Sequence, residues 1–259
     1  TLFRSSRALA IFNGGNALAT VVAAPLGSYL GSTIGWRGAF LCLVPVAIVA
    51  FIWQYFSLPN MGRNQRPSPR KSVFRLLHQP AVSVGLMACG LFFMGQFALF
   101  TYVRPVLETV THVSPSGLSL ILLTIGIAGF IGTLIVALVL NAAFYLTLMA
   151  IPLLMALIAG VLMLTGDSLW IVALLLGFWG MLATAAPTGW WTWIARTLPE
   201  DAEAGGGLMV AVIQLSIALG STAGGVVFDT FGWQSTFALS SILLLSAGGL
   251  TFTTSRHRK

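Results

Sequence analysis

The chain has 259 residues, of which 57% are hydrophobic and only 7% are charged. Soluble domains carry about a quarter charged residues, so this composition excludes an ordinary water-soluble protein and indicates a chain that lies mainly in lipid. The formal net charge is +7. In a membrane protein such an excess of Arg and Lys is explained first by the cytoplasmic loops that set its orientation, so we expect no nucleic-acid partner.

Eight apolar segments are long enough to cross about 30 Å of hydrocarbon as helices. Helices satisfy their own backbone hydrogen bonds in lipid, and no strand-like alternation competes with them. The sequence therefore predicts an all-α membrane protein with eight transmembrane helices. In chain order they are expected near Ala8–Leu30, Trp36–Phe56, Ala81–Val103, Ser116–Leu140, Phe144–Leu164, Leu169–Trp190, Gly206–Phe228 and Trp233–Thr253.

The longest connection between these spans divides the chain into two parts. Residues 59–80 are basic and proline-rich in their first half, and their second half mixes apolar residues with Arg70, Lys71 and Arg75. That second half suits either a short helix on the inner membrane surface or a charged linker. We predict two helices in 1–58, a cytoplasmic linker in 59–80 and a six-helix bundle in 81–259. Because the chain opens on TLFRSSR without a methionine, we expect it to lack its natural beginning.

The positions of Arg and Lys predict the orientation. If the N-terminus is cytoplasmic, eleven of the 13 basic residues lie inside, and only Arg37 and Arg104 lie outside. Cytoplasmic loops carry the excess of Arg and Lys. Both termini of this multi-pass protein are therefore expected in the cytoplasm.

Two stretches of the chain resemble each other. Residues 206–237 align without a gap on residues 9–40, with identities at six of 32 positions. Each copy reads as a long apolar helix, a Gly-Trp turn and a second apolar helix, with the turns at Gly35-Trp36 and Gly232-Trp233. Any two Gly- and Ala-rich membrane helices can align, but the shared turn favours a transporter built from two related halves.

Polar side chains inside the predicted spans are uncharged. No Asp, Glu, Lys, Arg or His lies in a span away from its ends, and the sequence shows no catalytic pair, metal-ligand cluster or phosphate loop. We predict no enzymatic activity, no metal and no cofactor. A single amide suits a hydrogen bond between helices, whereas several amides near aromatic rings suit a neutral, flat, polar ligand. The predicted ligand contacts are Asn13, Asn16, Gln96, Tyr102, Thr188 and Gln214.

The first helix resembles that of the drug:proton antiporters of the major facilitator superfamily. It carries a degenerate form of their antiporter motif at Gly15, Ala24, Pro25, Gly27 and Ser28. Ala24 replaces the usual Gly before Pro. Gly35-Trp36-Arg37 stands where that family has a Gly-Trp-Arg turn. The resemblance implies that the eight spans are helices five to twelve of a twelve-helix fold. The chain would then hold a complete C-terminal bundle and two helices of the N-terminal one.

Longer stretches resemble bacterial purine ribonucleoside efflux pumps of that superfamily. They are Ala23–Arg37, Phe74–Leu77, Gly95–Val106, Gly126–Thr133, Gly189–Leu198 and Val210–Leu215. The resemblance implies an inner-membrane transporter, monomeric when intact, that exports purine ribonucleosides such as inosine by proton antiport. It also implies a central cavity lined by the first, third, fourth, sixth and seventh spans. A sugar or drug exporter of the same fold, or a truncated membrane protein that transports nothing, are the alternatives. The resemblance also implies that the first four helices, with the acidic residue expected there for proton coupling, are absent from the chain.

Reporter fusions test the predicted orientation. Fusions after Arg70 and after Lys259 are expected to report the cytoplasm, and a fusion near Glu108 the outside, because the basic loops stay on the inner side. Paired alkaline phosphatase and fluorescent-protein fusions measure this. An outward Arg70 would contradict both the orientation and the assignment of the spans.

Overall fold

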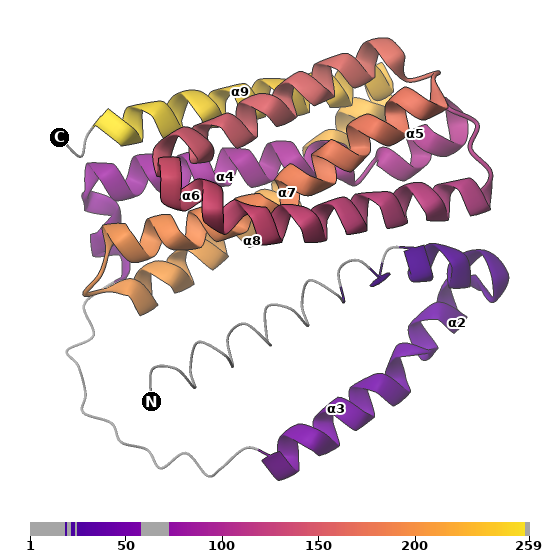
Figure 1. Cartoon of the computed structure of the whole chain (residues 1–259), viewed down its shortest axis with the longest axis horizontal. Helices are drawn as coiled ribbons and strands as arrows, with labels where there is room; N and C mark the ends of the chain where they lie inside the picture. The colour runs from indigo at the N-terminus through magenta and orange to yellow at the C-terminus, as the bar shows by residue number, and fades with distance from the viewer. Residues whose placement is uncertain (1–18, 20–21, 24, 58–72, 257–259) are drawn as a thin grey trace.

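The computed structural model describes residues 19, 22–23, 25–57 and 73–256, and all regular structure within them is helical. The predicted all-α fold is confirmed for these residues (Figure 1). Residues 25–33 are helical. The helices that follow are α2 (Gly35–Leu41), α3 (Leu43–Ser57), the 3₁₀ helix η1 (Val73–His78), α4 (Pro80–Phe100), α5 (Val103–Thr109), α6 (Pro115–Thr165), α7 (Leu169–Thr197), α8 (Ala202–Phe231) and α9 (Trp233–Arg256).

Six helical segments among the described residues are long and apolar enough to cross a membrane. One of them, α6, has 51 residues, more than twice the roughly 20 that a span needs. At Ala143 its backbone leaves the helical region, with φ −151° and ψ 68°, and the chain folds back (Figure 1). The helix α6 therefore supplies the two spans predicted at Ser116–Leu140 and Phe144–Leu164. The first predicted span, Ala8–Leu30, lies mostly outside the described residues.

The two Gly-Trp turns of the sequence repeat share one backbone feature. Gly35 has φ +75° and Gly232 has φ +86°, a region that side chains with a Cβ atom rarely adopt. Gly232 follows α8 and Gly35 begins α2, so each glycine lets the chain turn into the next helix. Because the glycines are aligned in the sequence repeat, the repeat corresponds to a recurring structural corner.

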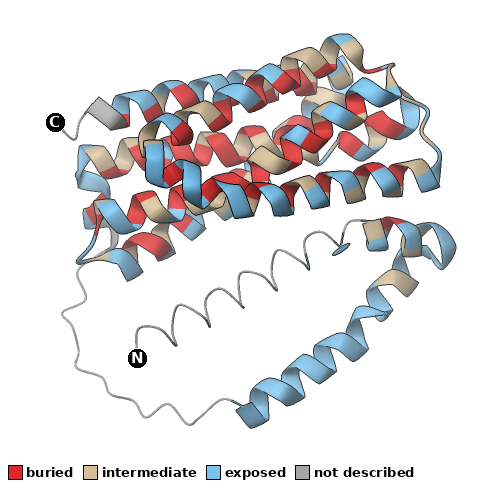
Figure 2. Ribbon diagram, viewed as in Figure 1, coloured by how far each residue is buried: buried red, intermediate tan, exposed pale blue. Residues whose placement is uncertain are grey.

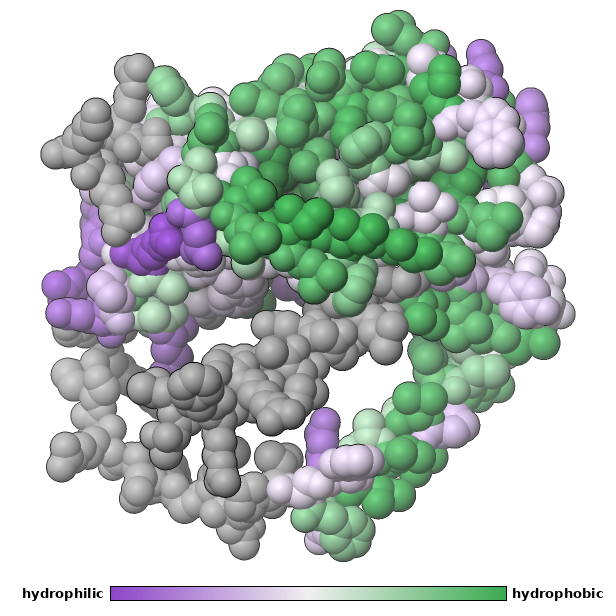
Figure 3. Space-filling model, viewed as in Figure 1, coloured by the Kyte–Doolittle hydropathy of each residue, from purple (hydrophilic) through white to green (hydrophobic). Residues whose placement is uncertain are grey.

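Helices α4, α6, α7, α8 and α9 form one bundle (Figure 1). Buried residues line its interior and exposed residues face outward (Figure 2). Many of the exposed residues are large and apolar. Hydrophilic residues gather at the two ends of the bundle and leave an apolar band between them (Figure 3). At one end, Arg104 and Glu108 of α5 form an exposed ion pair with an N–O distance of 2.8 Å. This distribution is the one expected of a bundle that crosses a bilayer.

Glycines bring helix backbones into direct contact inside this bundle. A Cβ atom on Gly220 of α8 would lie 2.3 Å from the carbonyl oxygen of Met94 on α4. One on Gly132 of α6 would lie 2.2 Å from the carbonyl oxygen of Met181 on α7. Small residues allow such close approach of membrane helices. These glycines therefore fix how α8 and the first half of α6 pack.

The segment before residue 58 is placed differently from the bundle. Helix α3 has no buried residue and diverges from the bundle (Figures 1 and 2). A Cβ atom on Gly27 or Gly31 would meet nothing within 4 Å. By contrast, η1 packs on α4 and α8 with Leu76 buried. The second half of the predicted linker is thus a short helix that belongs with the bundle.

The contact between α4 and α8 gives a stability prediction. Gly220→Leu is expected to destabilise the bundle by about 2–3 kcal/mol, because the larger side chain would collide with the backbone of α4 and force the two helices apart. Thermal unfolding of the purified chain in detergent measures this as a lower midpoint. Gly249→Leu is the matched control, since Gly249 is exposed on α9 and faces open space. Equal midpoints for the two variants would contradict the close packing at Gly220.

Candidate functional site

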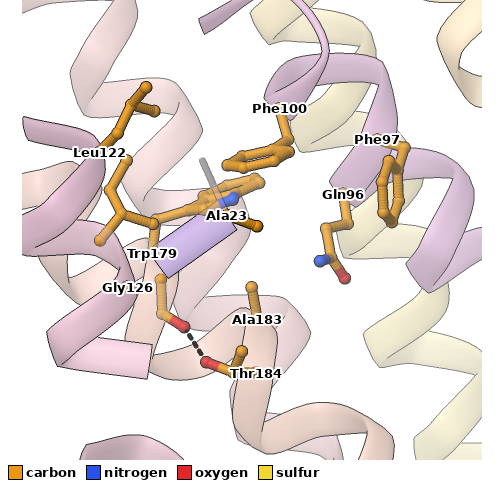
Figure 4. Close-up of a pocket in the computed structure, with 11 residues that line it drawn as sticks. Ala23, Gln96, Phe97, Phe100, Leu122, Gly126, Trp179, Ala183 and Thr184 are labelled. Atoms are coloured by element: carbon orange, nitrogen blue, oxygen red, sulfur yellow. Dashed lines mark hydrogen bonds between the residues drawn. The ribbon is translucent and has the colours of Figure 1, made fainter. Parts of the chain in front are cut away.

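A cavity of about 530 Å³ opens between α4, the first half of α6 and α7, and Ala23 from the N-terminal part also lines it (Figure 4). This volume lies within the range of small-molecule pockets. Its lining residues are Ala23, Gln96, Phe97, Phe100, Leu122, Ile125, Gly126, Trp179, Gly180, Ala183 and Thr184.

Helical spacing explains how three helices present this lining. On α4, Gln96 and Phe100 are four residues apart, and on α7 Trp179 and Ala183 have the same spacing. Residues four apart lie on one helix face. The small lining residues Gly126, Gly180 and Ala183 leave room beside the large ones. Gly180 packs directly against α6, where an added Cβ would lie 2.5 Å from the carbonyl oxygen of Ile125.

Two polar atoms of the lining are buried without a hydrogen-bond partner. They are Oε1 of Gln96 and Nε1 of Trp179, and they are the buried side-chain nitrogen and oxygen atoms in this condition among the described residues. Buried polar groups are nearly always paired. Figure 4 shows the Gln96 amide extending from α4 toward the part of α7 that carries Ala183 and Thr184. The cavity thus has unused hydrogen-bonding capacity on two of its walls.

The third polar side chain of the lining is already occupied. Thr184 Oγ1 donates a hydrogen bond to the carbonyl oxygen of Gly180, one turn earlier in α7 (Figure 4). Among the described residues, none that lines the cavity carries a charge. An ionised ligand would lose its hydration there without gaining a counter-charge. The cavity therefore suits a neutral molecule with a few polar atoms.

The structure places the sequence-predicted ligand contacts differently from one another. Gln96 lines the cavity. Tyr102 lies elsewhere, where its hydroxyl donates to the carbonyl oxygen of Ser221 at 2.9 Å. Its ring stacks on Phe228 with centroids 5.3 Å apart.

The other predicted contacts are not part of this lining. Thr188 is half-buried, and its carbonyl oxygen accepts a hydrogen bond from Thr192 at 2.7 Å. Gln214 is exposed on α8. Asn13 and Asn16 lie outside the described residues.

Two of the five antiporter-motif residues, Gly15 and Ala24, lie outside the residues that the structure describes. Of the others, Pro25 is half-buried, Gly27 is exposed and Ser28 is buried. Of the spans predicted to line the cavity, the first, third, fourth and sixth contribute residues to it.

Trp179 and Phe100 are lining residues that the sequence prediction missed. Tryptophans at the ends of membrane helices commonly serve as interfacial anchors. Trp179, however, lies well inside α7, is fully buried and has small residues beside it. A tryptophan far from both ends of a span was the available signal, because an interfacial role cannot explain it.

Comparison with known proteins gives the family. Residues 3–221 match the family described as Major Facilitator Superfamily. The chain is 62% identical over 255 residues to transcription regulatory protein OpdE of Pseudomonas aeruginosa, covering 97% of this chain and 63% of that protein. It is 41% identical over 240 residues to purine ribonucleoside efflux pump NepI of Salmonella enteritidis, covering 92% of this chain and 60% of that protein. NepI of Salmonella typhimurium matches with the same identity and coverage. The chain thus spans less than two thirds of the length of these relatives.

Proposed function

The chain belongs to the Major Facilitator Superfamily, and from that premise we propose that its whole protein exports purine ribonucleosides in exchange for protons. The observation that carries the proposal is the uncharged cavity with its two unpaired polar atoms, on Gln96 and Trp179. A purine ribonucleoside is neutral and planar in its base, and its polar atoms lie on the edges of the ring.

The shape of the lining supports a planar ligand over a sugar. Phe97 and Phe100 lie in an edge-to-face arrangement with centroids 6.3 Å apart, and both line the cavity. Aromatic rings favour contact with a flat, apolar face. A free sugar carries hydroxyl groups all round and has no aromatic face for these rings, whereas a ribonucleoside carries its hydroxyl groups on the ribose alone and presents a flat base. The same reasoning disfavours nucleotides, because a phosphate brings negative charge.

The names of the relatives are compatible with one activity. NepI is named as a purine ribonucleoside efflux pump, and OpdE as a transcription regulatory protein. Export of a solute lowers its concentration inside the cell. A transporter can therefore alter transcription through any regulator that responds to that solute, without contacting DNA itself.

We also propose the setting of this activity. The protein is placed in a bacterial inner membrane with both termini in the cytoplasm, and it acts as a monomer. Its parts are two helices of the N-terminal bundle in 1–58, the linker in 59–80 and the six-helix bundle in 81–259. Alternating access requires two bundles that move about a site at their interface. Proton coupling needs a group that changes its charge near neutral pH, and the predicted spans contain none away from their ends.

Because the proposed mechanism needs two complete bundles and a proton-exchanging group, we predict that residues 1–259 do not pump alone. Cells that express the chain are expected to show no pH-driven efflux of inosine and no added resistance to toxic nucleosides. A chimera that adds the four N-terminal helices of a close relative is expected to restore both, but not to export inosine monophosphate. Efflux of radiolabelled inosine from everted vesicles with an imposed pH gradient measures this. Proton-coupled efflux by the 259-residue chain itself would contradict the proposed need for two complete bundles.

The cavity predicts a difference between two amides in that chimera. Gln96→Ala is expected to weaken apparent affinity for inosine about fivefold, since losing one hydrogen bond to a neutral ligand costs about 1 kcal/mol. Its amount in the membrane should not fall. Gln214→Ala is the comparison and is expected to keep the affinity for inosine. The sequence predicts the same role for Gln214, but this residue is exposed on α8. Loss of protein and of transport in proportion would make Gln96 a structural residue.

A further inference from the structure

Trp179 has a hydrogen-bond donor that nothing in the described structure uses. Its relative exposure is 0%, and its Nε1 atom is buried with no partner. The indole N–H group can only donate, so neither a rotated amide nor an alternative tautomer can resolve the deficit. An unpaired buried donor is destabilising. A donor of this kind that lines a cavity points to an acceptor supplied by a ligand.

The neighbouring residues explain why the protein supplies no acceptor. Gly180 and Ala183, which line the cavity beside Trp179 on α7, have no polar side-chain atoms. Across from them, α6 contributes Leu122 and Gly126 to the lining. The hydroxyl of Thr184 is already bonded within α7. No backbone carbonyl oxygen of these helices accepts the Trp179 N–H group either.

We propose that Trp179 determines ligand specificity by donating its indole N–H to an acceptor atom in the plane of a neutral heterocycle. Gln96, on α4, accepts a hydrogen bond from a donor on the same ligand. The ligand is thereby held between α4 and α7, the two walls that carry the unpaired atoms. The identity of the heterocycle as a purine rests on the proposed function; the need for an in-plane acceptor does not.

The half-buried Phe100 lies beside this donor (Figure 4). Figure 4 shows the Phe100 ring next to the Trp179 indole, on the side of the cavity that also holds Ala23. Because Trp179 is fully covered, a ligand reaches its N–H only after neighbouring side chains move aside. Phe100 is then free to contact the face of the bound heterocycle.

Direct binding to the 259-residue chain tests the proposal without requiring transport. The chain is placed in lipid nanodiscs, and calorimetry measures adenosine and its 1-deaza, 3-deaza and 7-deaza analogues, each of which lacks one ring acceptor. For one of the three analogues, the wild-type chain is expected to bind about five- to tenfold more weakly than it binds adenosine. Trp179→Phe should weaken adenosine binding by the same factor and no longer distinguish that analogue.

Two variants separate a ligand contact from a structural role. Trp190→Phe is the matched control, because Trp190 is also buried in α7 at 2% exposure but packs on Phe92 and Trp193 away from the cavity. It should retain the discrimination. Benzothienylalanine at position 179 replaces the N–H by sulfur with little change of shape, so it tests the donor even if the Phe variant folds poorly. It should behave like Trp179→Phe.

The outcomes distinguish this inference from the proposed function. If both position-179 variants bind adenosine and all three analogues with the wild-type pattern of ratios, the inference is wrong, whether or not nucleosides are exported. If the wild-type chain binds theophylline through Trp179 but not adenosine, the inference stands and the proposed substrate is wrong. Failure to bind either heterocycle overturns the inference.

Discussion

Lipid offers no hydrogen bonds, and this constraint determines where the polar side chains of the bundle lie. Most hydroxyls bond to a carbonyl oxygen one turn earlier in their own helix, as Thr133 does to Gly129 at 3.0 Å. A few instead join helices, such as Ser240 of α9 to the carbonyl oxygen of Gly95 on α4 at 2.6 Å. Because unpaired polar groups are costly in such surroundings, the two buried side-chain atoms that remain unpaired among the described residues carry information. They occur together, on opposite walls of one cavity.

The same constraint explains how much of the fold could be predicted from the sequence. A long apolar segment satisfies its backbone hydrogen bonds in lipid by forming a helix, so hydrophobic length located the spans that fall within the described residues, including the two within α6. The Gly-Trp turns were also predictable, because Gly35 and Gly232 adopt backbone angles that suit glycine. Gly220 and Gly224 are four residues apart, a spacing typical of close contacts between membrane helices, and both pack against α4. For Gly27 and Gly31 the same spacing has no partner in the described structure.

The site was less predictable because residue type does not identify the partner. Gln96 and Tyr102 are six residues apart and therefore lie on different faces of the chain at the end of α4. Gln96 faces the cavity, whereas Tyr102 bonds to Ser221, a residue 119 positions away. No local pattern reveals a partner at that distance. Trp179 was overlooked for a related reason: the absence of a partner for its N–H becomes visible only when its neighbours on α4, α6 and α7 are known.

In the proposed transporter, the position of the two unpaired atoms limits what a ligand can do in the transport cycle. Gln96 and Trp179 belong to the same bundle, so a ligand that pairs with both gains the same hydrogen bonds whether the cavity opens inward or outward. A ligand that binds two conformations equally cannot shift the balance between them. The conformational preference must then come from contacts across the cavity, on the side marked by Ala23. In the proposed transporter, this assigns recognition of the ligand to the C-terminal bundle and coupling to the N-terminal one, where a group that exchanges protons can make the two conformations unequal.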